Sequence, residues 1–161
     1  MAKANSSRRA AREIALRVLY TVDIGKQPVE DVLSETIEAN EERLDERTAE
    51  FARSLVHGTL RARREIDNEL DRVAVGFPTV RQTAVDRNIL RLAAAEILFG
   101  VSDAPSGAVV NEAVELAKKY STNESGRFVN GVLGALVRDG ESRAATASMP
   151  ADSPSGGTAD E

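Results

Sequence analysis

The chain has 161 residues, no cysteine and a single histidine, so disulfides, thiolate metal sites, cysteine nucleophiles and most histidine-based catalytic sites are excluded. Its length fits one domain, and it contains no apolar run long enough to span a membrane. The net charge is −5, but residues 1–27 carry six basic and two acidic groups, whereas residues 28–50 carry two basic and nine acidic groups. This asymmetry predicts a polyanion-binding site at the N-terminal end, and the absence of cysteine favours a reducing, cytoplasmic compartment.

Apolar residues recur with helical spacing over most of the chain before residue 138, and strand-like alternation is nowhere sustained. The five prolines all lie outside these periodic segments, as expected because proline breaks the interior of a helix. The pattern predicts an all-α protein, a compact bundle of about seven helices.

The first predicted helix spans residues 8–24, with one of the two preceding serines as its N-cap. Arg8, Arg9 and Arg12 fall in its first turns, where the helix dipole is positive and each cation costs roughly 0.3–1 kcal/mol. A helix with a purely structural role would favour Asp or Glu at these positions. The placement therefore predicts contact with RNA or DNA; the alternative is a solvated, frayed basic end.

A second helix is predicted over residues 28–39, and its acidic outer side is interpreted as a solvated face. Asp45 is predicted to cap a third helical stretch that continues to Val73. Whether this stretch is one helix or two is left open by the pattern. His57 has no acidic neighbour close in sequence and is interpreted as a surface or boundary residue.

The third stretch also carries a second basic cluster, formed by Arg61, Arg63 and Arg64. Two interpretations of this cluster stay open. It could extend a polyanion-binding surface, or it could pair with the nearby Glu65 and Asp67.

The most apolar segment, from Thr83 to Phe99, is predicted to be the central helix of the bundle. Thr83 and Asp86 form a capping-box-like start, and the dipole favours a carboxylate in the first turn. Glu96 on such a buried helix is expected either to be paired or to lie at the rim. Gly100 is predicted to end the helix.

Two more helices follow, from Ala108 to Tyr120 and over the segment that contains Phe128 and ends near Val137. The last of these contains Asn130-Gly131, although a glycine costs a helix roughly 0.8–1 kcal/mol relative to alanine. Two explanations stay open: close contact between helices, or close approach of a ligand backbone.

The chain is therefore divided into a flexible basic arm (1–7), a helical domain (8–138) and an acidic tail (139–161). The tail is predicted to be disordered because its composition, rich in Ser, Ala, Gly, Pro, Thr and acids, cannot bury enough apolar surface. No Walker loop, dinucleotide fingerprint, paired-carboxylate motif or metal-ligand spacing occurs. We therefore expect no cofactor, no metal and no enzymatic activity.

Four segments resemble the bacterial NusB family of transcription antitermination proteins: RRAAREIALRVLYTVD, VDRNILRLAAAEIL, a Pro105 loop followed by VVNEAVELAKKYS, and ESGRFVNGVL. Together they cover nearly everything from Arg8 to Val137. The resemblance implies an all-α fold of two helical subdomains packed across each other. It also implies a non-enzymatic role: binding a single-stranded boxA element of nascent ribosomal RNA with the ribosomal protein that acts as NusE, as part of the transcription elongation complex.

The resemblance also implies site residues. An RNA-binding set falls on the basic start, on the tyrosine of the LY segment and on the FVNG motif: Lys3, Arg8, Arg9, Arg12, Tyr20, Phe128, Asn130 and Gly131. Asp86 and Glu124 match acidic positions near the NusE contact, and their sign suits a basic ribosomal protein better than a phosphate backbone.

Two other functions are weighed against this one. NusB-like domains also precede the catalytic domain of some ribosomal RNA cytosine methyltransferases, but this chain is too short to hold such a domain and has no cysteine. A stand-alone domain related to those enzymes is therefore one alternative. The other is a helical protein-interaction module without an RNA role; a continuous positive groove between the first and last helices would favour RNA binding instead.

Overall fold

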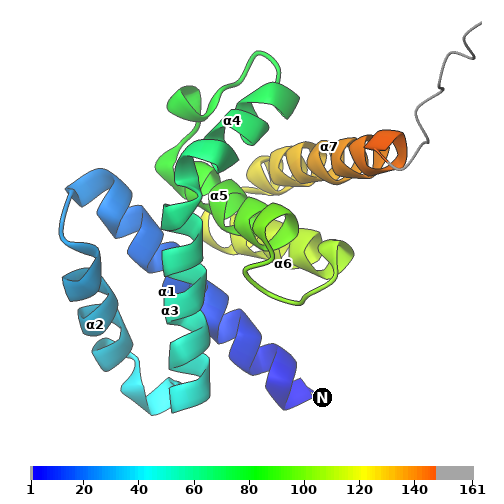
Figure 1. The fold of residues 1–161 in the computed structure, drawn as a ribbon. Coiled ribbons are helices and arrows are strands. Elements are labelled where there is room, and N and C mark those ends of the chain that lie inside the picture. The colour runs from blue at the N-terminus through cyan, green and yellow to red at the C-terminus, as the bar shows by residue number, and fades with distance from the viewer. Residues whose placement is uncertain (1, 148–161) are drawn as a thin grey trace, which may run out of the picture.

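The computed structural model describes the backbone of residues 2–147 and the side chains of residues 6–147. This part of the chain forms seven α-helices and two short 3-10 helices, with no strand (Figure 1). The α-helices are α1 (Ala2–Gly25), α2 (Val29–Ala39), α3 (Glu46–Arg61), α4 (Arg63–Val73), α5 (Ala84–Phe99), α6 (Ser106–Tyr120) and α7 (Asn123–Ala147); the 3-10 helices are η1 (Glu41–Arg43) and η2 (Thr79–Arg81). The predicted all-α class is confirmed.

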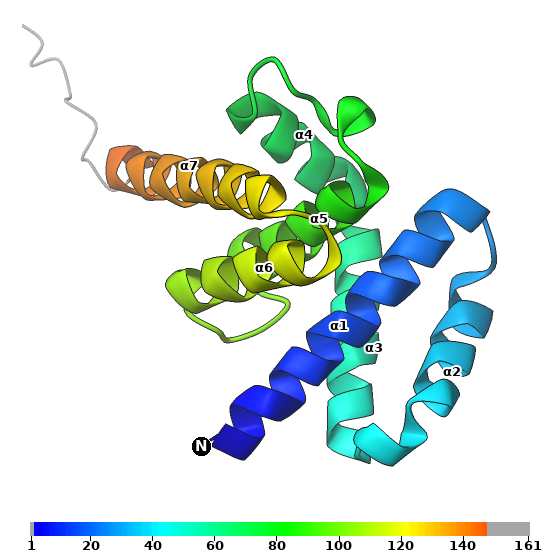
Figure 2. The same cartoon turned by 180° about the vertical axis from the view of Figure 1, so that it is seen from behind.

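Helix α5 is the centre of the molecule, as the sequence predicts. Every residue from Asn88 to Glu96 is buried, and α5 packs against α1, α3, α4, α6 and α7. Helices α1, α2 and α3 form one group, and α4 to α7 form the other, as Figures 1 and 2 show from opposite sides. The largest fully buried side chains come from both groups, and they include Leu19, Leu33, Leu55, Ile66, Leu70, Ile89, Leu90, Leu92, Leu133 and Leu136. The two subdomains therefore share one core across α5.

Three predicted helix ends, at Asp45, Thr83 and Gly100, rest on short-range contacts and are confirmed, although the Asp86 carboxylate does not complete a capping box and binds Ser125 instead. The Asp45 carboxylate accepts a hydrogen bond from the Thr48 amide at 2.7 Å at the start of α3. The Thr83 hydroxyl accepts one from the Asp86 amide at 3.3 Å at the start of α5. Gly100 ends α5 in the left-handed conformation, with φ of 60°, which glycine adopts without steric cost.

The third helical stretch is two helices, which the sequence left open. Ala62, with φ of −99° and ψ of 10°, separates α3 from α4. Close packing fixes α3 against the loop after α5, because a Cβ added at Gly58 would lie 2.7 Å from Val101 Cγ2. The break lets α3 pack on α1 while α4 turns towards α7.

The structure differs from the prediction at both ends. Helix α1 begins at Ala2, so no serine caps it near residue 7 and the backbone of residues 2–7 is not a separate arm. Helix α7 continues to Ala147, although residues 139–147 were predicted to be disordered. These residues include good helix formers, and α4 binds two of them, through the pairs Arg72–Asp139 and Glu69–Arg143. The rest of the predicted tail, 148–161, lies outside the described residues.

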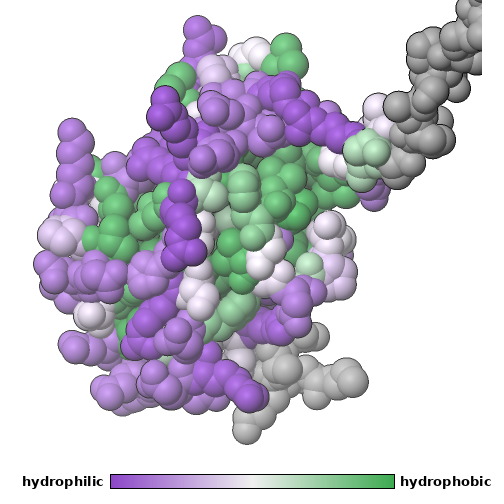
Figure 3. Space-filling view, viewed as in Figure 1, coloured by the Kyte–Doolittle hydropathy of each residue, from purple (hydrophilic) through white to green (hydrophobic). Residues whose placement is uncertain are grey.

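The surface in the view of Figure 3 is mostly hydrophilic, and its broadest apolar area lies to the right of α3 and below α4. Phe99, at the end of α5, is 43% exposed. No helix in the described part of the chain is long and apolar enough to cross a membrane.

Candidate nucleic-acid interface

The side of α1 that faces α6 carries two ion pairs one helical turn apart, and we call these four residues the α1–α6 seam. The Arg9 guanidinium donates two hydrogen bonds to Glu112, both at 3.0 Å, and Lys119 donates one to Glu13 at 2.7 Å. The hydrogen bond and charge of Glu112 raise the pKa of Arg9, and those of Glu13 raise the pKa of Lys119. Both cations therefore stay charged, and Arg9 keeps 58% of its side chain exposed.

Arg8 is also paired but remains accessible. Its guanidinium lies 3.0 Å from the Asp103 carboxylate and 5.6 Å from the centre of the Phe51 ring, and its side chain is 42% exposed. Because α1 begins at Ala2, Arg8 and its neighbours lie beyond the first turn, where the effect of the helix dipole has faded. The dipole argument made from the sequence therefore does not hold, and the case for this end rests on exposed charge.

Arg12 has a different environment from the other two arginines. Its residue exposure is only 6%, and its guanidinium donates to both Glu96 oxygens at 2.8–3.3 Å. The Ser102 hydroxyl donates a further hydrogen bond to Glu96 at 2.8 Å. Glu96 is therefore paired, the first of the two expectations, and Arg12 ties α1 to the inside of α5 rather than presenting a cation to solvent.

Tyr20 lines a cavity of about 530 Å³ where α1 and α2 diverge. The walls come from α1, α2, α5 and α6 and from Asn40, which follows α2: Leu16, Arg17, Tyr20, Thr21, Glu35, Thr36, Ala39, Asn40, Val85 and Tyr120. Arg17 at its rim is exposed and forms no ion pair with any described residue. Sequence reasoning missed Arg17 and Tyr120 as site residues, although the spacing of Arg9, Arg17 and Tyr20 places them near one helix face.

The two predicted partner-binding acids lie at the junction of α5 and α7. Asp86 is buried, at 8% exposure, and its Oδ2 accepts a hydrogen bond from the Ser125 hydroxyl at 3.0 Å. Its Oδ1 has no hydrogen-bond partner among the described residues. Glu124, in the first turn of α7, is exposed, so Glu124 presents its charge to solvent while Asp86 holds the junction together.

The FVNG motif lies in the first half of α7. Phe128 is partly buried and meets Phe77 edge-on, with ring centres 5.3 Å apart. Asn130 and Gly131 are exposed. A Cβ added at Gly131 would meet nothing within 4 Å, so close contact between helices, the first explanation offered for this glycine, is excluded.

Helix α6 connects these features into one path along the molecule. It runs from the Arg9–Glu112 pair past Lys119 to Tyr120 at the cavity. The first turn of α7, which follows, places Ser125 against Asp86. Figure 2 shows α1, α6 and the start of α7 on this face. The structure therefore brings the seam, Tyr20 and the α5–α7 junction together, while Arg12 points inward and the Lys3 side chain lies outside the described residues.

The end of α1 is held by a polar cluster around Asp23. Its carboxylate accepts hydrogen bonds from Arg87 at 2.6–2.9 Å and from Asn88 at 3.0 Å, with Arg91 at 3.4 Å and Arg63 at 3.8 Å. Burial alone would raise the pKa of Asp23, but the hydrogen bonds from Arg87 and Asn88 and the charge of Arg91 outweigh it, so the pKa is lowered. The cluster joins α1 to α4 and α5.

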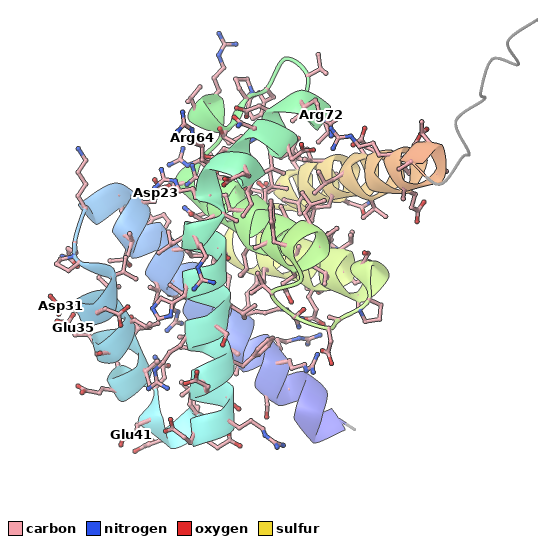
Figure 4. The ribbon with its side chains drawn as sticks, viewed as in Figure 1. Asp23, Asp31, Glu35, Glu41, Arg64 and Arg72 are labelled. Atoms are coloured by element: carbon pink, nitrogen blue, oxygen red, sulfur yellow. The ribbon has the colours of Figure 1, made fainter. Side chains whose placement is uncertain are left out.

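The second basic cluster does not pair with its sequence neighbours. Asp67 binds Arg91 through two hydrogen bonds, at 2.8 and 2.9 Å, so its carboxylate is engaged elsewhere. Arg61 and Arg64 are exposed and form no ion pair within the described residues. Arg63, the third member, lies 3.8 Å from Asp23, and Figure 4 labels Arg64 near the start of α4.

The described residues contain no group of three side chains that could hold a metal ion. Fold and surface together define an all-α binding protein of two helical subdomains, with a charged seam beside a cavity that contains two tyrosines. The chain belongs to the NusB family, whose model matches residues 9–138.

Individual relatives agree with this assignment. A transcription antitermination protein NusB from Symbiobacterium thermophilum is 44% identical over 138 residues, which are 82% of this chain and 90% of the relative. A crystal structure of the antitermination factors NusB and NusE in complex with double-stranded RNA matches with a TM-score of 0.75 and 33% identity, covering 83% of this chain and 97% of the matched chain. A structure of T. maritima NusB matches with the same TM-score and identity over 82% of this chain and 91% of the other. The NusB-like fold and the family predicted from the sequence are confirmed.

Proposed function

We propose that this protein is a transcription antitermination factor that binds a boxA-like single-stranded element of nascent ribosomal RNA together with the ribosomal protein acting as NusE. It would work on the elongation complex in the cytoplasm, without catalysing a reaction. Family membership supports the antitermination role, and the complex of NusB and NusE with double-stranded RNA supports binding of RNA and of NusE.

The observation that carries the RNA-binding part is the α1–α6 seam. It holds Arg9 charged and exposed on the helix face that continues to Arg17 and Tyr20. Exposed arginines attract phosphates, and aromatic rings accept unstacked bases. We assign phosphate contact to Arg8 and Arg9, with Lys3 before them, and base or backbone contact to Tyr20, Phe128, Asn130 and Gly131. Arg12 supports this surface through its buried pair with Glu96.

The NusE contact is assigned to the α5–α7 junction. Glu124 offers an exposed carboxylate, which suits a basic partner. Asp86 contributes through its hydrogen bond to Ser125, which fixes the first turn of α7. Replacing Glu124 with Gln should therefore weaken NusE binding and leave RNA binding by the chain alone no worse.

RNA titration at several salt concentrations, with and without NusE, tests the proposal. For single strands, each neutralised phosphate contributes about −0.7 to the slope of log K against log salt. The double variant Arg8→Gln/Arg9→Gln should flatten this slope by up to about 1.4 units. Arg47→Gln is the control, because Arg47 is exposed, lies on the acidic segment and forms no ion pair with described residues. Equal slopes for wild type and the Arg8/Arg9 variant would contradict the proposal.

The two alternatives are less well supported. The chain covers 90% of the Symbiobacterium relative, which favours a stand-alone factor over a domain detached from a methyltransferase. An interaction module without an RNA role would bind NusE but no RNA in the same titration.

A further inference from the structure

The cavity between α1 and α2 has a wall that is mostly apolar and partly polar. We propose that it binds a single guanine base of the RNA strand, unstacked from its neighbours. This inference rests on the proposed function and extends it, because it names the base that the site selects and the residues that select it.

The size and apolar walls of the cavity suit a base. Its volume of about 530 Å³ falls within the range of roughly 300–1,000 Å³ that is typical of ligand pockets. Tyr20, on α1, and Tyr120, at the end of α6, each supply an aromatic ring to the lining. Stacking on such rings accepts any base, so selection must come from the polar groups.

Several polar groups on α1 and α2 can accept hydrogen bonds from a ligand. The Thr21 hydroxyl donates its proton to the Arg17 carbonyl at 2.8 Å, and the Thr36 hydroxyl donates its proton to Val32 at 2.7 Å. The Asn40 amide nitrogen donates to the Thr36 carbonyl at 2.8 Å, which leaves the amide oxygen free to accept and the second N–H free to donate.

Glu35 completes the acceptor set. It is exposed on α2 (labelled in Figure 4), lines the cavity, and has no hydrogen bond or ion pair with any described residue. An ionised carboxylate accepts only, through two oxygens held side by side. The cavity therefore offers paired acceptors to a ligand that brings paired donors.

Guanine is the base that meets this requirement. Its Watson–Crick edge carries two adjacent donors, the N1–H and the N2 amino group, which match the two oxygens of one carboxylate. Adenine and cytosine place an acceptor beside their amino donor, and uracil flanks its single N–H with two carbonyls. Each of these would set an acceptor against an acceptor, and an unsatisfied polar group in a partly enclosed site weakens binding.

The rim of the cavity fits the rest of the nucleotide. Arg17 is exposed there and forms no ion pair with described residues, so its guanidinium is available to the phosphate beside the inserted base. The base would thus enter between the tyrosines while the strand continues along α1 towards Arg9.

The test places guanine, inosine or adenine at each position in turn of a boxA-like strand and measures binding by fluorescence anisotropy. At one position, guanine should bind roughly 5- to 150-fold more tightly than adenine, the range of one good bidentate contact. Inosine, which lacks the N2 amino group, should fall between them. Glu35→Gln should abolish this discrimination while leaving the adenine strand bound as before or better.

Glu38→Gln is the matched control, because Glu38 is exposed on the same helix and does not line the cavity. It removes the same charge and should keep the guanine preference. A wild-type protein that binds RNA but favours guanine at no position, or equal loss of preference in both variants, would overturn the inference and leave the proposed function standing. Failure to bind any RNA would instead overturn the proposed function.

Binding of guanosine monophosphate alone tests whether the ligand of the cavity is a base within an RNA strand or a free guanine nucleotide. If it binds saturably and Glu35→Gln removes that binding, while strands show no guanine preference, the cavity takes a free guanine nucleotide and the RNA-strand proposal is wrong. If guanosine monophosphate competes only with strands that carry guanine at the preferred position, the strand proposal is supported.

Discussion

Asp23 shows how much one partly buried carboxylate can organise. Its oxygens contact Arg87, Asn88 and Arg91 from α5 and Arg63 from α4. Asn88 and Arg91 are buried, and removing one partner of a buried ion pair costs about 3–5 kcal/mol. We expect Asp23→Asn to lower the melting temperature by roughly 6 °C or more, since about 1 kcal/mol shifts a domain of this size by about 2–4 °C. Asp31→Asn, at an exposed position without a partner among the described residues, is the control and should change little.

Low pH should remove the stabilisation that the ionised Asp23 carboxylate provides. The folded pKa of Asp23 is lowered, so its stabilisation is complete above the unfolded value, about 3.9, and is lost as the pH falls through the folded pKa. The stability difference between wild type and Asp23→Asn, measured by urea unfolding, should therefore be constant near neutral pH and shrink below about pH 4. A difference that persists unchanged in acid would show that packing, not charge, explains the effect.

Substituting Gly131 tests whether this glycine serves RNA binding, because alanine would be the better helix former at this position. It lies exposed inside α7, and a Cβ there would meet nothing within 4 Å. Gly131→Ala should therefore stabilise the free protein by about 1 kcal/mol, which thermal melts can measure. If an RNA backbone approaches this glycine, the same variant should bind RNA less tightly. A gain in stability with unchanged RNA affinity would remove Gly131 from the interface.

At the level of elements, the sequence predicted what depends on near neighbours. The caps at Asp45 and Thr83 and the stop at Gly100 involve residues within one turn, so their chemistry is visible in the sequence. The end of α7 was mispredicted because composition alone describes a polar segment as unable to bury surface. Its helix is supported by Arg72 and Glu69 of α4, 67 and 74 positions away from their partners, and such contacts leave no local signal.

The extension of α7 should nevertheless be dispensable for the fold. Asp139 and Arg143 are bound at the surface; in Figure 4, Arg72 is labelled beside α7. Arg72 lowers the pKa of Asp139, but exposed ion pairs contribute little to stability. Truncation after Arg138 should lower the melting temperature by no more than about 4 °C, and truncation after Ala147 should have no effect. Loss of a cooperative melting transition in the shorter chain would show that the extension belongs to the core.

The whole molecule depends on pairs that no local pattern reveals. Arg9 and Glu112 are 103 positions apart, and Arg12 and Glu96 are 84 apart. The sequence correctly placed a basic cluster on α1 and a charged residue on the buried α5. The sequence could not show that Arg9 faces solvent while Arg12 faces the core. Arg8, Arg9 and Arg12 differ only in their angle around the helix. The cavity, formed by residues from four helices, was invisible for the same reason.

This difference between Arg9 and Arg12 gives the last prediction. Arg12→Gln leaves Glu96 buried without its cation, so stability should fall by about 3–5 kcal/mol. Arg9→Gln breaks an exposed pair and should cost no more than about 1 kcal/mol.

The two variants should have the opposite ranking in RNA binding. Binding is measured at a temperature where both Arg9→Gln and Arg12→Gln remain folded. Arg9→Gln should weaken binding and flatten the salt slope by up to about 0.7 units, whereas Arg12→Gln should leave the slope unchanged. The double replacement Arg12→Met/Glu96→Leu should recover most of the lost stability, because apolar side chains can replace a buried ion pair, and should retain the wild-type slope. If Arg12→Gln instead flattens the slope as much as Arg9→Gln does and melts like wild type, then Arg12 contacts RNA directly and does not serve as the link between the two subdomains.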